Sequence, residues 1–107
     1  MKILLDECVT KLLKAHLPAH NVFTVTQMRW NGLKNGELLS QCASAGFDVV
    51  LTIDKNISTQ QNIAKYPLII IVFHSVTSKI DELVQFIPSF EKALPEFRKG
   101  NLYVIEK

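Results

Sequence analysis

The sequence predicts an α/β domain built on a mainly parallel sheet, and three observations lead to this prediction. Short apolar runs rich in β-branched residues lie at residues 3–5, 49–53 and 68–73, and such runs are typical of strands buried on both faces. Segments with helical features separate them, and this alternation is typical of parallel strands joined by right-handed crossovers. The 107 residues are 48% hydrophobic and contain few glycines and prolines, which favours one compact domain over residues 1–107.

Five segments are expected to be strands. Each is a short run of apolar residues bounded by polar or turn-forming residues. They are residues 2–5, 21–25, 48–53, 68–73 and 102–105. The fourth segment is so apolar that we expect a central or nearly central strand, covered on both faces and flanked by the first and third strands.

Capping and stop signals predict the first two helices. Thr10 can cap a helix that runs to about residue 16, and Pro18 ends it. Asn35 can cap a second helix, and Gly46 is a typical residue just beyond a helix end. A loop is expected between residues 26 and 34.

The remaining helical segments lie in the second half of the chain. Residues 55–65 are polar and are expected to form one or two short helical turns. Ser78 can cap a helix through residue 86, and Pro88 fits the first turn of a further helical piece that reaches residue 97.

Composition excludes several classes of protein. The longest apolar stretch, residues 67–73, is far shorter than the about 20 residues that cross a bilayer, and the first residues lack the features of a signal peptide. Cys8 and Cys42, both in elements expected to be buried, do not make a disulfide framework. We therefore expect a cytoplasmic protein without a membrane partner. Its net charge of +2 permits a nucleic-acid partner without requiring one.

Two of the predicted strands end directly in acidic residues. Asp6 and Glu7 follow the first strand, and Asp54 follows the third. Ligands bind at the carboxyl ends of strands in an open parallel sheet, so Asp6 and Asp54 are expected to face one site. Clustered carboxylates repel each other unless a cation compensates, and a divalent metal with oxygen ligands is the simplest one. A solvated strand end and an ordinary Asp-Lys-Asn turn are the structural alternatives.

Other polar residues have a functional and a structural interpretation. Glu37 lies in the first turn of the second helix, where the helix dipole alone gives an acid about 0.3–1 kcal/mol. Glu7 is either a second acid behind the site or an exposed side chain. A small basic group with one tryptophan could hold a phosphate backbone, or it could be a solvated surface with a packed ring. Its members are Arg29, Trp30, Lys34 and Lys55.

Three segments together resemble a short family of PIN-like domains. They are MKILLDE at residues 1–7, GLKNGELL at residues 32–39 and FDVVLTIDKN at residues 47–56. The resemblance continues through Gln60-Gln61-Asn62 into the following strand and thus covers most of the chain. It implies a three-layer α/β/α sandwich around a mainly parallel sheet of four to five strands. It also implies a metal-dependent ribonuclease, which in this superfamily is often the toxin of a toxin–antitoxin pair.

The resemblance assigns site residues by position. Asp6 matches the acid after the family's first strand, and Asp54 matches the acid of the Thr-x-Asp-Lys motif. Many relatives have an aspartate where Asn35 stands, so Glu37 is expected to supply the intervening carboxylate, with Glu7 and Asn35 supporting the ligands. The chain is also shorter than a standard PIN toxin and lacks much of the helical insert that carries a further acid.

The resemblance further implies what the site binds. Asp6, Glu37 and Asp54 would hold Mg²⁺ or Mn²⁺ for phosphodiester hydrolysis, and the basic group would contact RNA. The implied partners are the RNA substrate, a small antitoxin-like protein encoded nearby and, as an open option, a second copy of the chain.

Two alternatives stay open. A phosphorylation-dependent receiver domain also places acids after its first strand and a phosphoaccepting aspartate after its third, although the later part of this chain matches a receiver poorly. A catalytically silent PIN-like module that acts through partner binding fits the Asn35 departure.

Overall fold

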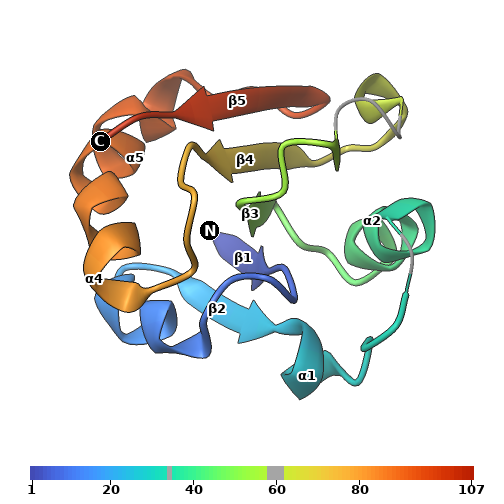
Figure 1. Ribbon diagram of the computed structural model, residues 1–107. Coiled ribbons are helices and arrows are strands. Elements are labelled where there is room, and N and C mark those ends of the chain that lie inside the picture. Colours follow the sequence, from blue (N-terminus) through green and yellow to red (C-terminus); the bar gives the residue numbers. More distant parts are fainter. Residues whose placement is uncertain (34, 58–61) are drawn as a thin grey trace.

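The predicted parallel α/β fold is confirmed. The computed structural model describes residues 1–33, 35–57 and 62–107, and within them it shows a five-stranded, all-parallel sheet flanked by helices (Figure 1). The strands are β1 (Lys2–Leu5), β2 (Asn21–Thr24), β3 (Val49–Thr52), β4 (Ile69–Phe73) and β5 (Asn101–Ile105). Their order across the sheet is β2-β1-β3-β4-β5.

This order corrects one expectation about β4. The strand is buried along its whole length, as its composition predicts, but its neighbours are β3 and β5. Of the two predicted neighbours, β3 is confirmed, and β1 is wrong, because β1 pairs with β2 and β3. The middle of the sheet is therefore β3, whose four residues are all buried.

The helices cover nearly the predicted spans, and those after β4 are divided into α and 3₁₀ segments. The α-helices are α1 (Val25–Met28), α2 (Asn35–Ser44), α4 (Ile80–Leu83) and α5 (Ile87–Ala93). The 3₁₀ helices are Lys11–His16, Ile63–Lys65, Val84–Phe86 and Leu94–Glu96. Thr10 caps the first of these as predicted, since its side chain accepts a hydrogen bond from the backbone of Leu12. Gly46, with a φ of 79°, follows the end of α2.

Three of the predicted helix boundaries are wrong. The expected loop begins as α1, where Thr24 and Gln27 form a capping box. Helix α2 begins at Asn35 itself, so Asn35 is not the residue before the helix. Ser78 does not cap α4, which begins after Lys79 without a side-chain cap.

The two faces of the sheet carry separate hydrophobic cores. Alternate residues of a strand point to opposite faces, so Ile69 and Ile71 join the core under α4 and α5, and Ile70 joins the core under α2. Figure 1 shows α2 on one side of the sheet and α4 and α5 on the other. The result is a three-layer α/β/α sandwich.

The cysteines differ in their surroundings. Cys42 is buried on α2, as expected, whereas Cys8 is exposed in the turn after β1, where the sequence suggested burial. Both thiols are free. Burial, together with the charge of Asp6, raises the pKa of Cys42 to about 12, so this thiol stays protonated at neutral pH.

Asp48 connects the start of β1 to Lys99 at the end of the sheet opposite Asp54. Its Oδ2 accepts a hydrogen bond of 2.9 Å from the backbone of Lys2, and Lys99 lies 3.4 Å from Oδ1. The backbone hydrogen bond, with help from Lys99, lowers the pKa of Asp48. These contacts give Asp48 a structural role. In the described part of the chain no helix has the length and apolar character that a membrane span requires.

Replacing Ile70 by aspartate is expected to abolish folding. Ile70 is 0% exposed in β4, and an aspartate there would bury an unpaired charge, which costs more than the roughly 0.5–3 kcal/mol of most substitutions. Val104→Asp is the control, since Val104 is 56% exposed on β5. Thermal melting followed by circular dichroism checks both variants. A cooperatively melting Ile70→Asp protein would contradict the buried position of β4.

Candidate functional site

Asp6 and Asp54 follow two strands that pair directly with each other. β1 and β3 are parallel neighbours with Leu5 opposite Leu51. The ladder continues one residue further, because the N–H of Asp6 donates to the carbonyl of Leu51 at 3.0 Å. Both acids therefore lie at the carboxyl end of the sheet, as the sequence predicts.

The hydroxyl of Thr52 connects the two acids. Thr52 is the last residue of β3 and is 0% exposed. Its Oγ1 donates to Oδ2 of Asp6 at 2.8 Å and accepts from the N–H of Asp54 at 3.0 Å. The Cys8 Sγ lies 3.4 Å from the same Oγ1 and donates to Oδ2 of Asp6 at 3.8 Å.

Sequence reasoning did not single out Thr52. The signal was a hydroxyl at the end of the otherwise apolar run of residues 49–53. A buried hydroxyl needs a hydrogen-bond partner, and the nearest polar groups at that end of a parallel sheet are the acids that follow the strands. We name Asp6, Thr52 and Asp54 together the Asp6–Thr52–Asp54 unit.

A backbone N–H group donates a hydrogen bond to Oδ1 of each aspartate. The N–H of Glu7 donates to Oδ1 of Asp6 at 2.8 Å, and the N–H of Asn56 donates to Oδ1 of Asp54 at 2.9 Å. Both aspartates are partly buried. The two side chains are therefore held in place before any ligand binds.

Glu37 is not gathered with these two acids. It is exposed in the first turn of α2. Within residues 1–33, 35–57 and 62–107, no three or more histidine, cysteine, aspartate or glutamate side chains form a group that could hold a metal ion. The structure thus brings Asp6 and Asp54 together and does not assemble the predicted set of three carboxylates.

Glu7 is bonded to the α1 side of the molecule. It is exposed, and its Oε1 accepts a hydrogen bond of 3.2 Å from Nδ2 of Asn31. Asn31 also donates to the hydroxyl of Thr26 at 3.0 Å. These contacts turn the Glu7 side chain toward Asn31, and none of them joins it to the carboxylate of Asp6. For Asn35 the structure describes the backbone position alone.

The members of the predicted basic group have different surroundings. Arg29, with a φ of 61°, and Lys55 are exposed, and Lys34 falls outside the described residues. Trp30 is partly buried and meets the ring of Phe47 edge-on, with 5.8 Å between the ring centres. The structure therefore favours the packed-ring interpretation for Trp30. Gln60 and Gln61, which belong to the family resemblance, also fall outside the described residues.

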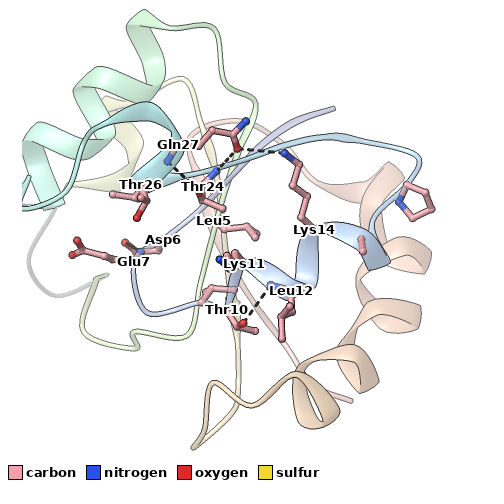
Figure 2. Close-up of a pocket in the computed structure, with 14 residues that line it drawn as sticks. Leu5, Asp6, Glu7, Thr10, Lys11, Leu12, Lys14, Thr24, Thr26 and Gln27 are labelled. Atoms are coloured by element: carbon pink, nitrogen blue, oxygen red, sulfur yellow. Dashed lines mark hydrogen bonds between the residues drawn. The ribbon is translucent and has the colours of Figure 1, made fainter.

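A cleft of about 1100 Å³ opens beside Asp6. Figure 2 shows it between the 3₁₀ helix Lys11–His16 and the junction of β2 with α1. Asp6 and Glu7 lie at one end of its lining, and Lys14 reaches Gln27 at the other (Figure 2).

Comparison of the chain with protein-family models, with curated proteins and with solved structures gives no match. The PIN-like assignment therefore stays a prediction from the sequence.

Thr52→Val is expected to destabilise the protein by roughly 1–3 kcal/mol, because it leaves Oδ2 of Asp6 and the N–H of Asp54 without their shared partner. Thr52→Ser is the matched control, since it keeps the hydroxyl and loses one methyl group, worth about 0.8 kcal/mol. Urea denaturation measures the free energy of unfolding of both variants. A Thr52→Val protein as stable as the wild type would show that the hydroxyl does not bind the two acids together.

Proposed function

We propose that this protein is a metal-dependent ribonuclease of the PIN-like type, acting as the toxin of a toxin–antitoxin pair. The observation that carries the proposal is the Asp6–Thr52–Asp54 unit. It holds two carboxylates from neighbouring parallel strands at the edge of the sheet where α/β enzymes bind their ligands.

The chemistry of these donors fits a hard divalent cation. Mg²⁺ is commonly bound through one or two carboxylates, with waters and substrate phosphates completing its shell. Oδ1 of Asp6 accepts one hydrogen bond, from the N–H of Glu7, and keeps a further lone pair, whereas Oδ2 accepts from Thr52 and from the Cys8 thiol. Oδ2 of Asp54 accepts none from the part of the chain that the structure describes. Asp6 and Asp54 can thus bind Mg²⁺ or Mn²⁺ without a third protein carboxylate.

The residues of the chain have distinct roles in this proposal. When bound, the cation supplies activation of the attacking water and neutralises charge on the leaving oxygen. Asp6 and Asp54 bind it, and Thr52 holds both acids in register. Lys55, which is exposed directly after Asp54, steadies the scissile phosphate, with Arg29 as a second cation on the RNA.

Glu37 is the proposed third ligand of the cation. Its position makes it a weaker candidate for this role than Asp6 and Asp54. It is exposed on the first turn of α2 rather than grouped with the other two acids. The same observation favours a second candidate function, a catalytically silent PIN-like module that acts by binding a partner.

The biological setting follows from the toxin assignment. A ribonuclease of this kind acts in the cytoplasm and needs restraint, which we assign to a small antitoxin-like protein encoded nearby that covers the acidic site. A homodimer is compatible with this arrangement.

Mn²⁺ is expected to raise the melting temperature of the wild-type protein, because a ligand of the native state stabilises it by about 2.7 kcal/mol at 100 times its Kd. Asp54→Asn should erase the shift. Without metal the same variant should be as stable as the wild type or slightly more so, since it removes repulsion between carboxylates. Asp48→Asn, at the other end of the sheet, should keep the full shift. Equal shifts in both variants would refute a metal site at Asp54.

Single-stranded RNA is expected to be cleaved only when Mg²⁺ or Mn²⁺ is present, and Asp6→Asn and Asp54→Asn should abolish cleavage. Gel analysis of a labelled RNA measures this, with Asp48→Asn as the active control. Glu37→Gln decides the role of Glu37: a large loss supports a third ligand, and full activity leaves it only a place at the helix terminus. Metal binding without any cleavage would favour the silent module instead.

A further inference from the structure

The cleft beside Asp6 has an acidic end and a basic end. Asp6 and Glu7 line it on the side of the proposed metal site, and Lys11 and Lys14 line it on the side of the 3₁₀ helix. Both lysines are exposed. A chain of phosphates that passes the acidic site with a bound cation therefore meets further positive charge inside the same cleft.

The basic end is organised by hydrogen bonds across the cleft. The ammonium of Lys14 donates to Oε1 of Gln27 at 3.3 Å, and the backbone N–H of Thr24 donates to the same oxygen at 3.4 Å. The N–H of Gln27 in turn donates to the hydroxyl of Thr24 at 3.0 Å. Figure 2 shows the Lys14–Gln27 contact linking the two walls, and the Thr24–Gln27 contacts holding Gln27 within its own wall.

This arrangement fixes which groups remain for a ligand. Because both hydrogen bonds of the Gln27 side-chain amide use its oxygen, its Nε2 is left as a donor with no partner among the described residues. The Lys14 ammonium has two further protons to donate. An amide donor and a cation held side by side suit an anionic oxygen acceptor such as a phosphate.

The wall between the two ends is apolar. Leu5 and Val25 are buried core residues that border the cleft. Leu12, with 56% of its surface exposed, lines it as well. An apolar wall between polar ends suits a nucleoside, whose ring and sugar pack on it while the phosphates contact the ends.

We propose that this cleft binds the nucleotide next to the scissile phosphate of single-stranded RNA, with that nucleotide's outer phosphate on the Lys14 ammonium and the Gln27 amide. The inference rests on the proposed ribonuclease function and adds the substrate subsite to it. Lys11 lies on the same wall as Lys14 and contributes charge to the same backbone.

Binding of a short, fluorescein-labelled, single-stranded oligoribonucleotide tests this assignment. Fluorescence anisotropy is measured on the full chain over a series of salt concentrations, in excess EDTA so that the metal-dependent reaction does not consume the probe. Lys14→Gln should weaken binding and lower the slope of log K against log[salt] by about 0.7, the value for one phosphate contact to a single strand.

Two control variants separate a charge contact from a structural role. Lys14→Arg keeps the charge and should keep the slope. Lys92→Gln removes an exposed lysine of α5 and should leave affinity and slope unchanged. In a heteronuclear NMR titration with the same RNA, the side-chain amide signal of Gln27 should shift in the wild type and much less in Lys14→Gln.

The outcomes distinguish the subsite from the enzyme function. An unchanged affinity and slope in Lys14→Gln, or an unmoved Gln27 signal, overturns the cleft assignment and leaves the cleavage assay to decide the ribonuclease function. Failure of the wild type to bind the probe in EDTA also overturns it, because Lys14 and Gln27 need no metal. Specific binding lost in Lys14→Gln, in a protein that cleaves no RNA, supports RNA binding in the cleft and refutes the ribonuclease function.

Discussion

A single buried hydroxyl links the core of this protein to its candidate site. Thr52 ends the central strand, and its oxygen joins the carboxylate after β1 to the backbone after β3. A buried hydroxyl without partners would cost free energy, so the core itself favours the arrangement that holds Asp6 and Asp54 together. The energy that stabilises the sheet therefore also positions two acids before any ligand arrives.

The parallel topology explains why these acids come from distant parts of the sequence. Every strand of the described sheet runs in the same direction, so all carboxyl ends lie along one edge. At the opposite edge, Asp48 is held by Lys2 and Lys99 in a local network. The two ends thus differ in role, with an ion pair and a hydrogen bond that join structural elements at one end and two positioned carboxylates at the other.

The sequence predicted most of the sheet because β-branched runs report burial directly. It did not predict the neighbours of β4, since composition indicates that both faces are covered but does not determine which strands lie alongside. The predicted start of α4 at Ser78 differs from the observed one by a single residue, which is the usual uncertainty of a helix end. The positions of Asp6 and Asp54 follow from the parallel order of the strands. The position of Glu37 depends instead on how α2 packs against the sheet, which the pattern of residues does not determine. Thr52 was visible as a polar residue in an apolar strand, and only its partners gave it a role.

The central claim is that the Asp6–Thr52–Asp54 unit binds a divalent cation. Paramagnetic broadening of backbone amide signals by substoichiometric Mn²⁺ tests it most directly, because broadening reports proximity to the ion whether or not any RNA is cleaved. The account predicts that the signals of Glu7 and Lys55 broaden first, while those beside Asp48 stay sharp. Broadening centred on other acidic residues, or none at these positions, would contradict it.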